Sequence, residues 1–397
     1  MSCCRQPENP TTGQPVSILR VDILGIGLTG KALTDLEKTI IREVEPYAIV
    51  LFGRNIADPK QLCDLIHEVK SIAKRPPMFM IDEEGGRVDR LRHLIPGLPS
   101  AEAFGEGHQS VELSSWMGKV IGMALRYFDI EVDLAPVVDI RGAQAPKGLE
   151  RRTFGADPET VIDLGGAFMR GLHSAGTGAC LKHFPGIGIG SADPHYGATV
   201  IDISLDALVH RDLLPFARLG NEAGAVMIGH GTYPQIDEPD LPATLSRRIA
   251  VDLLREAAGF KGVAMTDDME MHAVSDYGSY EYISERAVLA GNDVVMFCSH
   301  IERVPAIHSF LESKTRSDAA FRARIAEAAE RLEKYGQHID QLRHASKPAT
   351  SFETVADEAR RFVEAFEKSR GSHEAYVSEA ERRKDPRGGR TGREEWT

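Results

Sequence analysis

The 397-residue sequence contains few cysteines and no long hydrophobic run. Its five cysteines are scattered, and an odd number cannot form a complete set of disulfides. No apolar stretch approaches the roughly 18 residues that a transmembrane helix requires. Residues 1–15 are polar and proline-containing, without the apolar segment of a secretory signal. We therefore expect a reduced, cytoplasmic protein that does not span a membrane.

A basic surface is also missing, since the formal net charge is −12. No block of basic residues interrupts the globular part, so neither nucleic acids nor anionic membranes are expected partners. The compact His-x-His and His-Glu-x-x-His spacings of metal sites are absent as well. We expect no metal and no cofactor, and the sequence leaves the oligomeric state unknown.

The chain does contain a regular alternation of short apolar runs, rich in valine and isoleucine, with amphipathic stretches. This alternation predicts a TIM-like (β/α)8 barrel, with a doubly wound sheet as the competing α/β architecture. The predicted strands are Val16–Leu24, Ala48–Phe52, Met78–Ile81, Val132–Val138, Gly178–Leu181, Ala225–Ile228, Val263–Thr266 and Asp293–Phe297.

Helix-start signals lie between these predicted strands. Thr34-Asp-Leu-Glu37 matches a capping box, and Asp58-Pro59 and Asp157-Pro158 match an N-cap followed by the first helical residue. Each signal precedes apolar residues at helical spacing, as the barrel requires.

Three segments are expected along the chain. Residues 1–15 form a flexible tail, residues 16–340 form the catalytic barrel, and residues 341–397 form an extension. A helical pattern at Glu353–Glu367 opens the extension, and the charged, glycine-containing remainder is expected to be disordered.

One motif suggests a different activity. Gly25-Ile-Gly27-Leu-Thr-Gly30 matches the dinucleotide-binding fingerprint and supports an NAD-dependent oxidoreductase as a remote alternative. However, the helix signal comes only at Thr34, too late for the helix N-terminus to hold a pyrophosphate. The next strand also ends without an acidic residue for a ribose.

Ionisable residues follow five of the predicted strands. In a (β/α)8 barrel, the carboxyl ends of the strands meet at one mouth, where the chemistry takes place. Carboxylates accept hydrogen bonds from hydroxyls, whereas lysine, arginine and histidine donate them, so this mouth suits a hydroxyl-rich ligand. The segments are Asp82–Arg90, Asp139 with Arg151–Arg152, Lys182–His183, Gly229–His230 and Thr266–Asp268.

The loop after Lys182 carries the triplet Asp193-Pro194-His195. In an extended chain residues i and i+2 face the same side, so Asp193 and His195 would lie together. A carboxylate beside an imidazole fixes its tautomer and raises its pKa, which suits a proton donor. The alternative is a glycine-rich surface loop with two unrelated polar residues.

Six motifs together resemble glycoside hydrolase family 3, and within it the single-domain bacterial β-N-acetylhexosaminidases. The similarity covers about residues 16–336 in order. The motifs are LFGRN (51–55), IDEEGGRVDRL (81–91), RTFGADP (152–158), KHFPG (182–186), ADPH (192–195) and VAMTDDMEM (263–271).

This resemblance implies a retaining glycosidase that removes terminal N-acetylglucosamine from oligosaccharides or muropeptide fragments. It places the nucleophile at Asp267 and the acid/base at His195, oriented by Asp193. The sugar-binding positions that it implies are Asp82, Arg90, Arg152, Lys182 and His183.

The chain departs from the usual family pattern at Ile187, Pro194, Tyr196 and Thr199. These departures leave open the geometry of the loop and the preferred aglycone. A β-glucosidase, a phosphorylase of the same family and a sugar-binding protein without turnover remain alternatives. The sequence does not separate hydrolysis from phosphorolysis.

Overall fold

The computed structural model describes residues 21–105, 110–143, 146, 148–192 and 199–370. Its main sheet is parallel, in the order β5-β4-β3-β2-β1-β11-β10-β9-β6. β5 and β6 are two pieces of one strand, and they pair with the opposite edges β4 and β9, so the sheet closes. The predicted (β/α)8 barrel is confirmed. The strands are β1 (Leu24–Gly27), β2 (Ala48–Leu51), β3 (Met78–Ile81), β4 (Val132–Asp133), β5 (Gly178–Ala179), β6 (Leu181–Phe184), β9 (Ala225–Ile228), β10 (Val263–Asp268) and β11 (Val294–Phe297).

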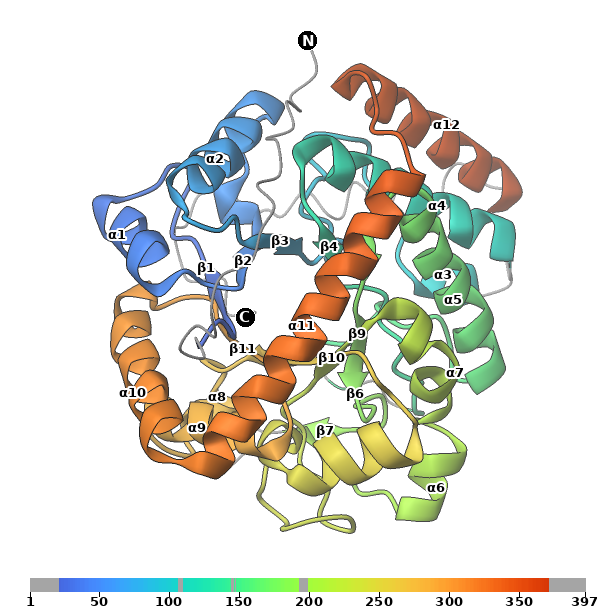
Figure 1. The fold of residues 1–397 in the computed structure, drawn as a ribbon. Coiled ribbons are helices and arrows are strands. Elements are labelled where there is room, and N and C mark those ends of the chain that lie inside the picture. Colours follow the sequence, from blue (N-terminus) through green and yellow to red (C-terminus); the bar gives the residue numbers. More distant parts are fainter. Residues whose placement is uncertain (1–20, 106–109, 144–145, 147, 193–198, 371–397) are drawn as a thin grey trace.

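Helices surround this barrel (Figure 1). The three helix starts predicted from sequence are present, with Thr34, Asp58 and Asp157 as N-caps. The helices are α1 (Asp35–Val44), α2 (Pro59–Ile72), α3 (Glu102–Gly105), α4 (Val111–Phe128), α5 (Pro158–Ser174), α6 (Leu205–His210), α7 (Leu214–Ala223), α8 (His272–Ser275), α9 (Tyr280–Ala290), α10 (Val304–Ser317), α11 (Ala319–Ala345) and α12 (Phe352–Arg370). Short 3-10 helices lie at Gly53–Asn55, Ala243–Leu245 and Ile301–Arg303, and a π-helix at Arg248–Ala257.

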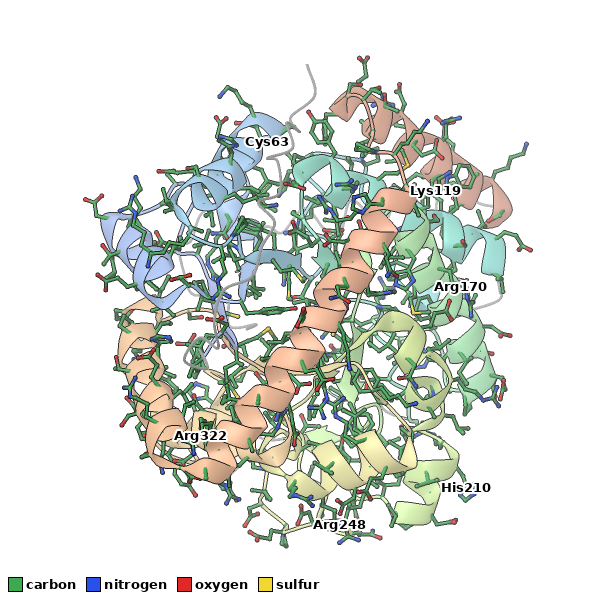
Figure 2. The ribbon with its side chains drawn as sticks, viewed as in Figure 1. Cys63, Lys119, Arg170, His210, Arg248 and Arg322 are labelled. Atoms are coloured by element: carbon green, nitrogen blue, oxygen red, sulfur yellow. The ribbon has the colours of Figure 1, made fainter. Side chains whose placement is uncertain are left out.

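The core lies between the strands and one apolar face of each helix. α2 illustrates the pattern, because Leu62, Leu65, Ile66 and Val69 are buried at helical spacing. The opposite faces are charged, and Lys119 on α4 and Arg170 on α5 lie exposed on the outside of the molecule (Figure 2). None of the helices among the described residues combines the length and apolar character needed to cross a membrane.

The first strand differs from its prediction. Strand pairing begins only at Leu24 and includes Gly25 and Gly27, so the predicted strand Val16–Leu24 is wrong for residues 21–23. A side chain at position 27 would place its Cβ 2.2 Å from the carbonyl oxygen of Cys298, which directly follows the neighbouring strand β11. Glycine is therefore required here by close strand packing and does not mark a phosphate-binding turn, which removes the support for an oxidoreductase.

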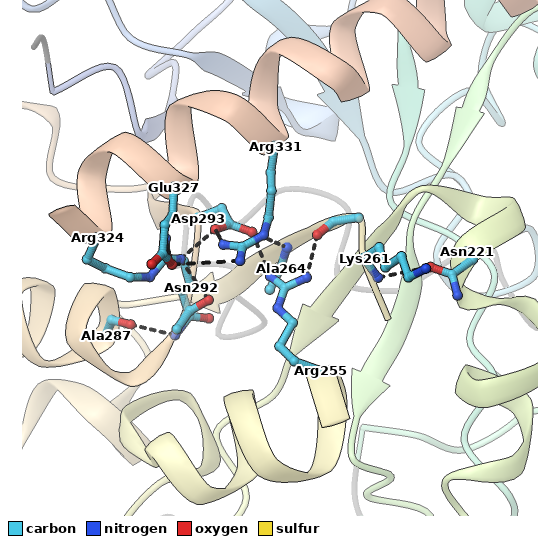
Figure 3. A network of polar contacts seen from close by, with 12 residues as sticks. Asn221, Arg255, Lys261, Ala264, Ala287, Asn292, Asp293, Arg324, Glu327 and Arg331 are labelled. Carbon is cyan, nitrogen blue, oxygen red and sulfur yellow. Dashed lines mark hydrogen bonds and ion pairs between the residues drawn. The ribbon is translucent and has the colours of Figure 1, made fainter. Parts of the chain in front are cut away.

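The long helix α11 runs across the barrel (Figure 1), at the end where the strands begin. Asp293, just before β11, accepts hydrogen bonds from Arg255 at 2.7 Å, Arg324 at 2.5 Å and Arg331 at 3.0 Å. Two of these arginines come from α11 (Figure 3). Sequence reasoning left Asp293 unassigned, and the structure places it in this network at the end opposite the expected mouth.

Candidate active site

Most of the predicted polar residues lie where strands of the barrel end. Asp82 follows β3 directly, Lys182 and His183 belong to β6, and Asp267 belongs to β10. Because the strands are parallel, these ends meet at the same mouth. Contacts between residues far apart in sequence confirm that the side chains converge.

Lys182 lies at the centre of a buried charge cluster. Its ammonium nitrogen is 2.5 Å from Asp82 Oδ1 and 2.5 Å from Glu84 Oε1, and its side chain is 2% exposed. Burial alone would lower the pKa of Lys182, but the two carboxylates outweigh burial and raise it. The ammonium is therefore charged and held in one position by the two carboxylates.

Glu84 joins this cluster to Arg152. The Arg152 guanidinium donates two hydrogen bonds of 2.8 Å to the two Glu84 carboxylate oxygens, and a third of 3.0 Å to the carbonyl of Gly148. Burial would raise the pKa of Glu84, but Arg152 and Lys182 lower it well below its usual range. Such a two-point contact fixes the plane of the guanidinium as well as its position.

Sequence reasoning did not select Glu84 as a site residue, although a signal was available. Glu84 is two positions after Asp82, and residues at i and i+2 of an extended chain face the same side. Both residues contact Lys182, whereas Glu83 between them contacts other partners. If the alternation of side-chain directions along β3 is continued past the end of the strand, Glu84 falls on the same side as Asp82 and is identified as a site residue.

His183 is held by Asp139, which follows β4. The ring nitrogen Nδ1 of His183 lies 2.7 Å from Asp139 Oδ2. The same carboxylate accepts the backbone N–H groups of His183 at 3.2 Å and Ile187 at 2.7 Å. Asp139 thereby sets the ring orientation and also ties down the loop that follows β6, a role that the sequence did not reveal.

Asp267 has an environment that favours its ionised form. It remains partly exposed at the end of β10. Burial would raise the pKa of Asp267, but the neighbouring His230 and His183 side chains lower it below its usual value. The backbone N–H of Asp268 contributes by donating to Asp267 Oδ1 at 2.8 Å. The result is an anionic carboxylate that a ligand can reach.

The adjacent Asp268 behaves differently. Burial, with Glu270 nearby, raises the pKa of Asp268 to about 8. Its Oδ1 accepts the N–H groups of Glu270 and Cys298, each at 3.2 Å, and Oδ2 is buried without a hydrogen-bond partner among the described residues. Neighbouring carboxylates with opposite pKa shifts usually serve different roles, so Asp267 is the anion and Asp268 supports the backbone around it.

His230, left unassigned from sequence, packs beneath this pair. Its Nε2 donates to the backbone carbonyl of Asp268 at 2.9 Å, and Nδ1 lies 2.6 Å from Thr244 Oγ1. Both ring nitrogens are therefore occupied by protein groups, and burial lowers the pKa of His230. We interpret it as a residue that positions the end of β10.

Arg90 occupies the loop after β3. Its guanidinium carbon lies 5.9 Å from the centre of the Phe52 ring, and its Nε is buried without a hydrogen-bond partner among the described residues. A buried donor left unpaired is costly unless a ligand completes it. The role of Arg90 in binding stays a prediction.

Glu83 holds the backbone of this loop. Its Oε2 accepts the N–H groups of Arg90 at 2.6 Å and Leu91 at 2.9 Å. Burial, together with Asp89 and Asp133, raises the pKa of Glu83 well above its usual value. A neutral Glu83 can satisfy these donors and also share its proton with a neighbouring carboxylate.

This arrangement predicts how stability depends on pH. The unfolded chain loses the Glu83 proton above about pH 4.5, whereas the folded protein keeps it to higher pH. The contribution of Glu83 to the free energy of unfolding therefore falls as pH rises above about 4.5. Glu83→Gln, which cannot titrate, should gain stability relative to the natural protein by up to roughly 1.4 kcal/mol per pH unit. Glu83→Ala should lose about 1–3 kcal/mol for each N–H left unpaired. Urea unfolding at pH 5.5 and 8.5 measures both, and parallel pH slopes for Gln and Glu would contradict the interpretation.

The predicted acid/base pair, Asp193 and His195, lies outside the described residues. The flanking strands are β7 (Ser191–Ala192) and β8 (Thr199–Val200), which pair antiparallel. The backbone of Thr232, after β9, bonds to Thr199 and Ile201 at 2.9 Å each. Both ends of the segment are therefore attached at the mouth, beside the loop that carries His230.

No group of three or more His, Cys, Asp or Glu side chains suited to a metal ion occurs among the described residues. The free thiols of Cys63, Cys180 and Cys298 lie within the barrel domain, and the last two are buried. The absence of a cofactor stays a prediction.

Comparisons with known proteins identify the family to which this chain is similar. The model of the glycosyl hydrolase family 3 N-terminal domain matches residues 19–334. A β-hexosaminidase of Pseudomonas aeruginosa (strain LESB58) is 35% identical over 277 residues, which is 70% of this chain and 82% of the relative. A β-hexosaminidase of Stenotrophomonas maltophilia (strain K279a) is 35% identical over 314 residues, covering 77% of this chain and 92% of the relative. A solved family 3 β-N-acetylglucosaminidase from Paenibacillus sp. superposes with a TM-score of 0.79 at 28% identity, covering 88% of this chain and 68% of that structure.

Proposed function

The chain belongs to glycosyl hydrolase family 3 and is a glycoside hydrolase, and from this premise we propose that it is a retaining, exo-acting β-N-acetylglucosaminidase. The observation that carries the proposal is Asp267, an anionic carboxylate that a ligand can reach, next to a fixed array of hydrogen-bonding groups. The names of the similar proteins, β-hexosaminidase and β-N-acetylglucosaminidase, support the choice of sugar.

In the proposed first step, an Asp267 oxygen attacks the anomeric carbon of the sugar. The bond from that carbon to the leaving-group oxygen breaks, and His195 supplies a proton to the departing oxygen. In the second step His195 accepts a proton from water, which attacks the anomeric carbon and releases Asp267. Two displacements at one carbon retain the β configuration.

Asp193 is proposed to hold the His195 ring and to favour its cation. Support comes from the sequence spacing and from the anchored ends of the loop. Within the described residues, the other nearby side chains that could act as the acid/base already contact protein groups. Glu84 is paired with Arg152 and Lys182, and both nitrogens of His230 contact protein groups.

The remaining residues are proposed to bind the sugar. Lys182, Arg152, Arg90 and His183 present donors, and Asp82 presents an acceptor that its ion pair with Lys182 keeps in place. Donors and acceptors in this mixture match the alternating roles of sugar hydroxyls. Because Lys182, Arg152 and His183 are already held by the carboxylates of Asp82, Glu84 and Asp139, little reorganisation of these groups is needed on binding.

The experiment that tests the function compares aryl β-N-acetylglucosaminide with aryl β-glucoside, each with and without inorganic phosphate. We expect faster release from the N-acetylglucosaminide and free N-acetylglucosamine as the product in both buffers. A sugar 1-phosphate as the main product would establish a phosphorylase, and preference for the glucoside would establish a β-glucosidase.

A 5-fluoro N-acetylglucosaminyl donor provides an independent test of the nucleophile. The fluorine slows both steps, and hydrolysis of the glycosyl-enzyme should be slow enough for isolation. Peptide mapping should then find the label on Asp267. A label on Asp268 or Glu83 would contradict the proposal.

Cell-wall muropeptide fragments are the proposed natural substrates, and the cytoplasm is the proposed location. The three free cysteines of the described part are consistent with a reducing compartment. Cell fractionation tests the location, and assays on purified muropeptides with and without the terminal sugar test the substrate.

Asp82→Ala should weaken both binding and turnover. The change leaves Lys182 with Glu84 alone and removes an acceptor for a sugar hydroxyl, at about 1–3 kcal/mol for each partner lost. We expect kcat/KM on the aryl N-acetylglucosaminide to fall by roughly ten- to a hundredfold, because sugar contacts tighten in the transition state. Asp82→Asn, which keeps the volume, serves as the milder comparison. Unchanged kinetics in both variants would show that β3 does not face the substrate.

A further inference from the structure

The helix α12 (Phe352–Arg370) lies beyond the family match, which ends at residue 334. Figure 1 shows it beside α4, on the outside of the barrel. Val355, Ala359, Phe362 and Phe366 are buried and repeat at helical spacing, so one face of α12 is packed. The helix predicted at Glu353–Glu367 is thus an integral part of the folded protein.

The aromatic side chains of α12 reach two different elements. Phe362 meets Trp116 of α4 edge-on at a centroid distance of 5.7 Å, and Trp116 Nε1 donates to Glu358 at 2.8 Å. Phe366 packs against Phe104 of α3, with centroids 4.9 Å apart. Through these contacts α12 fixes α3 and α4 relative to each other.

From Phe104, packing continues to the segment that carries Arg152. The rings of Phe104 and Phe154 lie 6.3 Å apart, and Phe154 is two residues after Arg152. At Gly105 the two backbones are so close that a Cβ would lie 1.8 Å from the carbonyl oxygen of Phe154. In addition, the N–H of Glu102 donates to the carbonyl of Arg151 at 3.4 Å.

A second route runs through α4 to Glu84. Met117, next to Trp116, packs so closely on Gly85 that a Cβ there would lie 2.3 Å from the methionine methyl. Gly85 follows Glu84 directly and has a φ of +75°, a conformation that strongly favours glycine. Through Met117, α4 therefore packs directly against the backbone beside the Glu84 carboxylate.

We propose that α12 positions the Glu84–Arg152 pair, and that Phe366 is its principal positioning residue. The two routes converge on the two partners of one ion pair, Glu84 through α4 and Arg152 through α3. Burial excludes water from the packed aromatic rings, and a closely packed wall transmits a shift to the groups in front of it. The proposal rests on the proposed role of Arg152 in sugar binding.

Phe366→Ala tests this proposal by steady-state kinetics. We expect KM for the aryl N-acetylglucosaminide to rise about tenfold with kcat changed less than about twofold, because a misplaced binding group weakens binding without touching the reacting atoms. Phe366→Leu should restore most of the lost affinity. Phe366→Val, which creates a smaller cavity, gives the same test if the alanine variant does not fold.

Phe352→Ala is the matched control. Phe352 also belongs to α12, but it packs on Tyr127 and Phe128 at the far end of α4, with centroid distances of 5.5 Å to both. This variant should lose thermal stability while its KM stays within about twofold of the natural value. Equal increases of KM in both alanine variants would overturn the positional role and leave general destabilisation as the cause.

A double-mutant cycle of Phe366→Ala with Arg152→Ala tests the positioning role of Phe366 separately from the sugar-binding role of Arg152. If Phe366 acts through Arg152, adding Phe366→Ala to Arg152→Ala should raise KM little further. If the two substitutions raise KM by factors that multiply fully in the double variant, the positioning role is overturned and the sugar-binding role remains. An unchanged KM in Phe366→Ala alone has the same meaning. An unchanged KM in Arg152→Ala would instead contradict the sugar-binding role of Arg152 and this inference with it.

Discussion

Asp267→Asn should lower kcat by about ten-thousandfold or more while leaving the fold unchanged. The amide preserves the volume of the side chain, but it cannot form the glycosyl ester through which the proposed reaction passes. Steady-state assays with an aryl N-acetylglucosaminide measure the loss, and circular dichroism confirms folding. Binding of N-acetylglucosamine should persist, because the array around Lys182 is retained.

Asp268→Asn is the control for this prediction. The raised pKa of about 8 keeps Asp268 mostly protonated at neutral pH, and an amide oxygen can still accept the N–H groups of Glu270 and Cys298. We expect kcat to change by less than about tenfold. A large loss in Asp268→Asn with activity retained in Asp267→Asn would reverse the roles of the two carboxylates.

His195→Ala should have an effect that depends on the leaving group. A poorly acidic alcohol needs a proton as it departs, so kcat/KM for such substrates should fall by about a hundred- to ten-thousandfold. Dinitrophenolate leaves without a proton, and its release to form the glycosyl-enzyme should be much less affected. Pre-steady-state kinetics with both classes of aryl glycoside measure the difference.

The second step of the His195→Ala reaction offers a direct chemical test. Without a base to deprotonate water, the glycosyl-enzyme should accumulate after a burst of dinitrophenolate. Azide needs no deprotonation, so it should attack the anomeric carbon, displace Asp267 and yield a β-glycosyl azide. Equal losses for good and poor leaving groups, with no azide product, would show that His195 is not the acid/base.

Asp193→Asn should change the pH dependence of kcat/KM, because Asp193 is proposed to hold the ring of His195. Removing the carboxylate withdraws its stabilisation of the imidazolium, so the pKa of His195 should fall. The acid form is then lost at a lower pH, and the alkaline limb of the kcat/KM profile should shift downward. An unshifted alkaline limb would mean that Asp193 does not contact the ring.

The barrel and most of its mouth could be predicted from local patterns. Asp82, Lys182 and Asp267 each follow or end an apolar run, and parallel strands bring such ends together. The roles predicted for these residues came from the resemblance to the family. Glu84 and Asp139 were not recognised as site residues. The alternation that places Glu84 on the side of Asp82 was not carried past the strand end, and the ion-pair and hydrogen-bond partners of both residues lie far away along the chain. Glu84 and Arg152 are 68 positions apart, and Asp139 and His183 are 44 positions apart.

The first strand shows where local patterns mislead. Gly25 and Gly27 suggested a turn, since glycine usually interrupts strands. Both lie within β1, and at position 27 the backbone of Cys298 leaves no space for a Cβ. That backbone is more than 270 positions away in the chain, by the residue numbers, so no local rule could anticipate it.

The sequence by itself determined the helices and their caps, the alternation that builds the barrel, and the residue types at its mouth. Hydrogen bonds between close neighbours and the spacing of apolar residues suffice for these features. Tertiary structure alone decided that Asp267 is anionic while Asp268 holds its proton, and that α12 packs behind the Glu84–Arg152 pair. The reason is that pKa values and packing depend on burial and on distances between side chains, and only the folded chain sets those distances.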